Sequence, residues 1–138
     1  MNPLPSAPVN VPKILVIEDD QNSREAMTTY LISRGFDVQA AADGPEAIAI
    51  GRAFSPELII SDWMLDGNYN GVDVVRILYR QHPNFAVIFI SAFPLDQLDA
   101  QSRELPVKGL LAKPISLAKL NKLVEQALQS IVASYGDC

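Results

Sequence analysis

Five short apolar runs, separated by stretches with helical spacing, constrain the fold of this chain more than any other feature. Three of them are continuous, with no polar residue inside them: residues 14–17, 58–60 and 86–90. Two less regular runs lie at residues 36–41 and 107–112. Continuous runs rich in β-branched residues are typical of strands buried on both faces, as in parallel sheets covered by helices. The sequence therefore predicts five parallel strands.

Helices are expected in the stretches between these runs. Asn22 and Glu25 are spaced as a capping box, which predicts that they begin the first helix. Expected helices follow the five runs, ending near residues 35, 54, 82, 104 and 131. Strands that alternate with helices form right-handed crossovers in a single sheet. The prediction is an α/β fold of the flavodoxin-like, doubly wound type, with a five-stranded parallel sheet in order 2-1-3-4-5 and five helices.

Length and charge exclude several classes of protein. The 138 residues suffice for one domain, and the net charge of -5 without a basic run argues against direct nucleic-acid binding. No apolar stretch approaches the roughly 18–20 residues of a membrane span. The N-terminus lacks the pattern of a secretory signal, and Cys138 is the only cysteine. We expect a soluble, cytoplasmic domain at residues 12–134, with a flexible proline-rich arm at 1–11 and a short tail at 135–138.

Most of the expected strands end in a residue that can do chemistry. Residues 18–20 are Glu-Asp-Asp, and Asp62, Ser91 and Lys113 follow the third, fourth and fifth strands. The carboxyl ends of parallel strands share one edge of the sheet, so these side chains should lie together. Clustered carboxylates repel one another, and Mg²⁺ (or Mn²⁺) would relieve the repulsion. An aspartate beside such an ion can act as a nucleophile toward phosphorus, with the hydroxyl and the ammonium holding phosphoryl oxygens.

Each of these residues also has an ordinary structural explanation. An acidic triplet after a strand is a favourable start for a helix, and an aspartate at a strand end is often a turn residue. Ser91 and Lys113 are uninformative by themselves. Their placement together, each at the carboxyl end of a strand, is what favours a common site.

The strand that ends in residues 18–20, the strand that ends in Asp62, Ser91-Ala92 and Lys113-Pro114 resemble the receiver domain of two-component response regulators. The similarity extends from about Lys13 to Leu128. It implies that a cis peptide bond joins Lys113 to Pro114. It also implies specific roles for site residues: Asp62 as phosphoacceptor, Glu18, Asp19, Asp62 and the Met64 carbonyl as Mg²⁺ ligands, Ser91 as switch hydroxyl, Ala92 as the small residue beside the phosphate, and Lys113 as the phosphoryl-binding lysine.

Several positions depart from the family pattern. Asp66 stands where proline is common, and Leu110 stands where an aromatic residue usually moves together with the switch hydroxyl. Leu110 therefore places the usual serine–aromatic coupling in doubt. Met64 and Phe93, two residues after Asp62 and Ser91, are apolar where polar residues can position the attacking water. We expect slow autodephosphorylation.

The resemblance implies a signalling switch rather than a conventional enzyme. A sensor histidine kinase or histidine phosphotransfer protein would donate the phosphoryl group. The face of the fourth helix, fifth strand and fifth helix would then bind a protein target. His82, the only histidine, is expected at a helix end rather than as a phosphorelay residue. Met1 and the short tail favour a free-standing protein, although a receiver module cut from a hybrid kinase would look similar.

Two other functions remain open. One is a phosphorylation-independent interaction module with the receiver fold, which Leu110 favours and the complete set of acidic residues, Ser91 and Lys113 opposes. The other is a Mg²⁺-dependent phosphatase with an aspartyl nucleophile. Such enzymes usually carry a second aspartate two residues after the nucleophile, where this chain has Met64.

Overall fold

The computed structural model describes residues 11–65, 70–92 and 104–136. Its strands are β1 (Lys13–Ile17), β2 (Asp37–Ala41), β3 (Leu58–Asp62), β4 (Ala86–Ser91) and β5 (Val107–Ala112). Its helices are α1 (Gln21–Ser33), α2 (Gly44–Phe54), α3 (Gly71–Gln81) and α5 (Leu117–Gly136). The helix expected between Leu95 and Glu104 falls largely on residues outside the described part. The described residues contain four helices.

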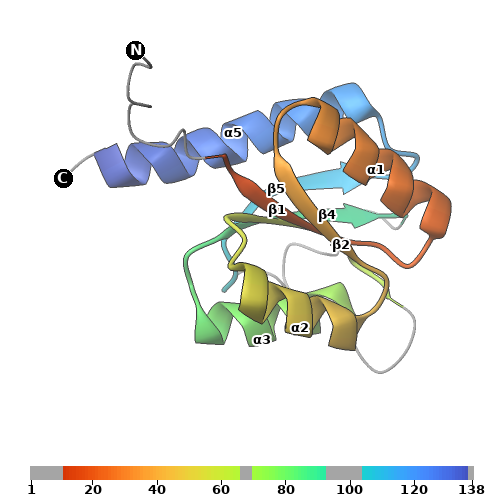
Figure 1. Ribbon diagram of the computed structural model, residues 1–138, viewed down its shortest axis with the longest axis horizontal. Coiled ribbons are helices and arrows are strands. Elements are labelled where there is room, and N and C mark those ends of the chain that lie inside the picture. The colour runs from red at the N-terminus through yellow and green to blue at the C-terminus, as the bar shows by residue number, and fades with distance from the viewer. Residues whose placement is uncertain (1–10, 66–69, 93–103, 137–138) are drawn as a thin grey trace, which may run out of the picture.

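The five strands form one parallel sheet in the order β2-β1-β3-β4-β5, which confirms the expected topology. Helices α1 and α5 cover one face of the sheet, and α2 and α3 cover the other (Figure 1). The central strand β3 is buried along its whole length between β1 and β4. The strand order therefore brings the carboxyl ends of β1, β3 and β4 side by side, with β5 next to β4.

Alternate residues of the strands divide the core into two layers. In β1, Leu15 and Ile17 pack in the layer with α2 and α3, whereas Ile14 and Val16 pack in the layer with α1 and α5. Because successive side chains of a strand point to opposite faces, a continuous apolar run is required to fill both layers. This requirement explains why the buried strands lack the polar–apolar alternation of a sheet with one wet face.

The start of α1 differs from the expected capping box. Asp20, with an extended backbone, is the N-cap, and its Oδ2 accepts a hydrogen bond of 2.8 Å from the amide of Ser23. This hydrogen bond also lowers the pKa of Asp20. Asn22 and Glu25 already lie inside the helix, where Glu25 accepts from Gln21 instead. The expectation was wrong because the chain turns directly at the end of β1, two residues earlier than the spacing suggested.

The other helix ends follow local chemistry. Asp43 caps α2 by accepting from the amide of Glu46, and Gly35 takes the left-handed conformation, with φ of 96°, just after α1. His82 is the exposed C-cap of α3, as expected. Helix α5 continues to Gly136, two residues past the expected end of the domain. Among the described residues, none of the helices has both the length and the apolar character needed to cross a bilayer.

Candidate functional site

Three carboxylates meet at the carboxyl edge of the sheet. Glu18 and Asp19 directly follow β1, and Asp62 is the last residue of β3. One carboxylate oxygen from each lies within 4.8 Å of the other two. Glu18 is fully buried and Asp62 is 5% exposed, while Asp19 is half-buried. The site is therefore a shallow acidic cluster at the sheet edge, with Asp19 on its outer side.

Lys113 brings a positive charge to this cluster from the end of β5. Its Nζ lies 2.6 Å from Asp62 Oδ2 and 3.4 Å from Glu18 Oε1. The cis peptide bond between Lys113 and Pro114 is confirmed, and the Lys113 amide donates to the Ser91 carbonyl over 2.8 Å. Burial acts to lower the pKa of the ammonium, but the hydrogen bond and charge of Asp62 outweigh it, so the pKa lies above its ordinary value. Lys113 therefore remains a cation in the site.

The environment of Glu18 disfavours the charged form of its carboxyl. Burial raises the pKa of its carboxyl from 4.5 to about 7, and the negative charge of Asp62 adds to the increase. Its Oε1 is close to Lys113 Nζ and accepts from the Asp20 amide over 3.3 Å. Its Oε2 is buried without a hydrogen-bond partner in the described part of the chain. A buried oxygen left in this way costs free energy unless something else approaches it.

A hard divalent cation fits this set of donors. The cluster offers only oxygen ligands, its carboxylates are close enough to share one ion, and one buried oxygen is unpartnered. Mg²⁺ prefers such oxygen ligands and keeps several waters of its own, which the half-buried outer side at Asp19 leaves room for. Glu18, Asp19 and Asp62 are thus the side chains that could hold the ion.

The residues that flank Asp62 hold its backbone and side chain. The Met64 amide donates to Asp62 Oδ1 over 3.2 Å, and the Trp63 amide donates to the Ile90 carbonyl over 2.8 Å. The Trp63 ring is buried and meets Phe89 edge-to-face, with centroids 5.1 Å apart. Met64, in contrast, has a side chain that is 51% exposed at the mouth of the site.

Three of the remaining expected residues lie in the described part of the chain: Ser91, Ala92 and Leu110. Ser91, the last residue of β4, is buried, and Ala92 is the exposed residue that follows it. Leu110 is half-buried opposite Phe89 in the sheet and packs in the α2–α3 layer. Asp66 and Phe93 lie outside the described residues.

Arg24 takes part in the site, although its sequence position did not suggest it. The guanidinium donates to the backbone carbonyl of Glu18 over 2.9 Å and to that of Asp19 over 3.3 Å. It thereby ties the first helix to the backbone of the two acidic residues. A cation one turn into a helix that follows an acidic strand end is the only hint that the sequence offers.

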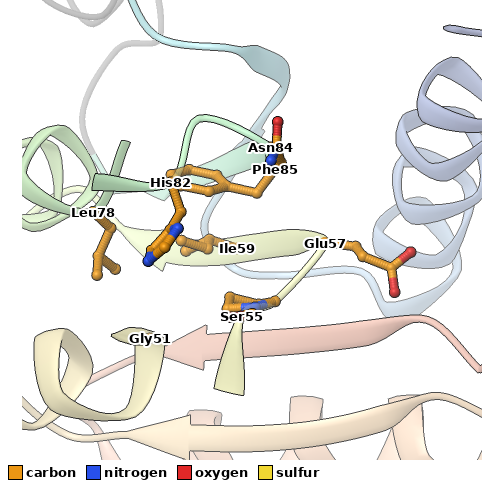
Figure 2. A pocket seen from close by; sticks show the side chains of 9 residues that line it. Gly51, Ser55, Glu57, Ile59, Leu78, His82, Asn84 and Phe85 are labelled. Carbon is orange, nitrogen blue, oxygen red and sulfur yellow. The ribbon is translucent and has the colours of Figure 1, made fainter. Parts of the chain in front are cut away.

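A separate recess lies at the opposite end of the sheet, away from the carboxylates. It has a volume of about 220 Å³ and lies between the C-terminal ends of α2 and α3 and the starts of β3 and β4. Figure 2 shows the His82 ring and Phe85 close to Ile59, with the Glu57 carboxylate directed away from them. Glu57 Oε1 accepts instead from the Lys13 amide. The recess has no acidic cluster and is not part of the site.

Comparison with known proteins identifies the family. The family model described as the response regulator receiver domain matches residues 14–125. The chain belongs to the response regulator receiver domain family. Among curated receiver-domain relatives, the transcriptional regulatory protein YcbL of Bacillus subtilis is 32% identical over 83% of this chain and 50% of its own length. The sensor kinase CckA of Brucella abortus is 33% identical over 84% of this chain and 12% of its own.

Solved receiver-domain structures share the fold. The CheY-like receiver domain protein from Methanospirillum hungatei superposes with a TM-score of 0.83 at 18% identity, covering 90% of this chain and 98% of that one. The receiver domain of a diguanylate cyclase from Desulfovibrio desulfuricans gives 0.78 at 25% identity, covering 91% and 99%. The chain spans half or less of the length of the curated relatives. Receiver domains thus occur in relatives with different additional segments.

Proposed function

We propose that this receiver domain accepts a phosphoryl group on Asp62, in a Mg²⁺-dependent transfer from a phosphohistidine of a sensor histidine kinase or histidine phosphotransfer protein. The observation that supports it most is the joint geometry of one cluster: three carboxylates within 4.8 Å and a lysine ammonium 2.6 Å from Asp62. Sites for phosphoryl transfer consist mainly of positioning groups and opposite charge, and this edge supplies both.

The chain's own residues account for the steps. A carboxylate oxygen of Asp62 forms a bond to phosphorus as the phosphorus–nitrogen bond breaks, and the electron pair of that bond stays on the imidazole nitrogen, which takes up a proton. Lys113 and the Ser91 hydroxyl bind phosphoryl oxygens, and Ala92 leaves space for them. Glu18, Asp19 and Asp62, with the Met64 carbonyl, would hold the Mg²⁺. When bound, the ion neutralises charge on the phosphoryl oxygens and the carboxylates.

Phosphorylation adds negative charge and strong acceptor oxygens beside Ser91 and Lys113, and so biases a two-state equilibrium. The face of β5, α5 and the fourth helix, which the sequence predicts between Leu95 and Glu104, then contacts a downstream protein. We place this signalling in the cytoplasm, where a sensor kinase would transfer its phosphoryl group to the receiver domain. In this proposal the domain works as a switch and not as a conventional enzyme. Its self-dephosphorylation is expected to be slow, because apolar Met64 and Phe93 do not position the attacking water.

Trp63 provides the reporter for a direct test. It is the only tryptophan, it is buried, and it follows Asp62 in the chain. We would titrate Mg²⁺ and then add acetyl phosphate or beryllofluoride, following fluorescence and intact mass in the native protein and in Asp62→Asn. Asp62→Asn preserves the size of the side chain and removes its negative charge, which includes the nucleophilic oxygen, the ion pair with Lys113 and one carboxylate of the metal cluster.

We expect a saturable Mg²⁺ response, a further response to the phosphodonor, and a mass gain of one phosphoryl group that Asp62→Asn lacks. If the native protein binds Mg²⁺ but gains no mass, phosphorylation is not its function. A phosphorylation-independent interaction module, which Leu110 favours, would then explain the fold better.

A further inference from the structure

Ser61 is a polar residue in an otherwise apolar stretch of sheet. It is fully buried in β3, and its neighbours in the adjacent strands are Ile17 and Phe89. A hydroxyl in such surroundings destabilises the fold unless it forms a hydrogen bond. Here the Ser61 Oγ donates to the backbone carbonyl of Asp62 over 2.9 Å. The one hydroxyl in this strand is thus directed at the residue that carries the chemistry.

The carbonyl that accepts this hydrogen bond lies at the end of β3, one residue beyond its pairing with β1. The pairing of β1 with β3 ends at Ile17 and Ser61, so Asp62 has no paired residue in β1. The amide side of the same peptide group faces β4, where the Trp63 N–H donates to the Ile90 carbonyl. The Ser61 hydroxyl therefore holds the carbonyl side of a peptide whose N–H side is held by β4.

Gly71, the first residue of α3, closes the same point from outside. A Cβ atom at this position would lie 2.0 Å from the Asp62 carbonyl oxygen and 2.8 Å from Ser61 Oγ. The Gly71 amide also donates to the Trp63 carbonyl over 2.8 Å. The Asp62 carbonyl thus lies between the Ser61 hydroxyl and the first residue of α3, with no room there for a Cβ atom.

We propose that Ser61 is a positioning residue, whose hydroxyl fixes the Asp62 backbone so that the carboxylate faces the phosphodonor. The inference rests on the proposed function and adds a residue that does not itself touch the phosphoryl group. The carboxylate and the fixed carbonyl belong to the same residue. One carboxylate oxygen pairs with the Lys113 ammonium, and the other accepts a hydrogen bond from the Met64 amide. A rotation of the Asp62 peptide would move both oxygens together and lower the rate of transfer.

A comparison of four side chains at position 61 separates the effect of the hydroxyl group from the effect of side-chain volume. Ser61→Ala removes the hydroxyl, and Ser61→Thr and Ser61→Val form a second pair of equal volume, with and without it. For each folded variant we would measure the Mg²⁺ midpoint from Trp63 fluorescence, the phosphorylation rate at saturating acetyl phosphate from intact mass, and the urea midpoint. Asp62→Asn serves as the unreactive control.

We expect the rate at saturating donor to fall at least fivefold in Ser61→Ala, and by a similar factor from Ser61→Thr to Ser61→Val, as the loss of one oriented hydrogen bond predicts. The Mg²⁺ midpoints should stay within about twofold, because the three carboxylates remain. A merely structural serine would lower the urea midpoint and leave these rates unchanged. If the phosphorylation rate depends only on the volume of the side chain, so that Ser61→Thr and Ser61→Val are equally slow, the inference is also wrong.

Failure of the proposed function looks different. In that case the native protein itself gains no phosphoryl group, and the positioning role falls with it. If the native protein is phosphorylated and Ser61→Ala matches its rate, the phosphoacceptor role of Asp62 stands and only the role of Ser61 is refuted.

Discussion

Gly71→Ala should be among the most damaging single-methyl changes in this molecule. The new Cβ would lie 2.0 Å from the backbone carbonyl oxygen of Asp62, whereas real Cβ atoms essentially never come within 3.0 Å of such an atom. The start of α3 or the end of β3 must therefore move by about 1 Å. Neither can yield by a side-chain rotation, because both atoms belong to backbone that is fixed by hydrogen bonds.

The expected cost is about 2–3 kcal/mol of unfolding free energy, the upper part of the range for overpacking a buried site. For a domain of this size, such a loss lowers the melting temperature by roughly 10 °C. The displacement should also slow phosphorylation, because the displaced oxygen belongs to Asp62, the proposed phosphoacceptor. Urea denaturation followed by Trp63 fluorescence measures the first effect, and intact mass after acetyl phosphate measures the second.

Gly51→Ala is the matched control. It adds the same methyl group to another helix, but the three atoms nearest to the new Cβ all belong to the Leu78 side chain, at 2.8 Å and beyond. The leucine can change rotamer, and alanine favours a helix interior by about 1 kcal/mol over glycine, so the net change should stay within about 1 kcal/mol. If Gly71→Ala is as stable as Gly51→Ala and is phosphorylated at the native rate, the close contact between α3 and Asp62 does not exist as described.

Three further outcomes are expected. In EDTA, the folded Glu18 carboxyl holds its proton more tightly than the unfolded one. Its contribution to stability is therefore present below pH 4.5 and is lost, up to about 3 kcal/mol, as the pH rises through about 7. Urea midpoints of native protein and Glu18→Gln across this range test it, and parallel curves would contradict it. Met64→Asn with Phe93→Glu should shorten the phosphoryl half-life roughly five- to tenfold by orienting the attacking water, and an unchanged half-life would remove the explanation. Asp20→Ala should lower the urea midpoint and Asn22→Ala should not, because Asp20 caps α1. If Asn22→Ala lowers the midpoint and Asp20→Ala does not, Asn22 is the capping residue after all.

The strands and their chemical ends could be predicted because each depends on local sequence. A continuous apolar run such as that before Asp62 indicates a strand buried on both faces, and parallel order then brings the strand ends together. The start of α1 was predicted wrongly at Asn22. Asp20 and Asn22 are both good capping residues, and the point where the chain leaves β1 makes Asp20 the N-cap.

The features that sequence reasoning missed depend on distances across the fold. Arg24 matters because two backbone carbonyls come within reach of its guanidinium, and Gly71 matters because a helix start meets a strand end. The high pKa of Glu18 depends on complete burial, which an acidic triplet does not reveal, since Asp19 and Asp20 beside it are more exposed. Ser61 did leave a trace in the sequence, as the one hydroxyl between an apolar run and the aspartate.

Helix α3 has one further consequence, which concerns how the molecule can be observed. Its eleven residues form a rod of about 16 Å whose first residue touches the Asp62 carbonyl and whose C-cap, His82, lies in the recess at the far end of the sheet. If α3 tilts as a unit when its first residue is displaced, His82 moves with it. Because the chain has a single histidine, the ring-proton resonances of His82 would then report such a tilt in an NMR spectrum without isotopic labelling.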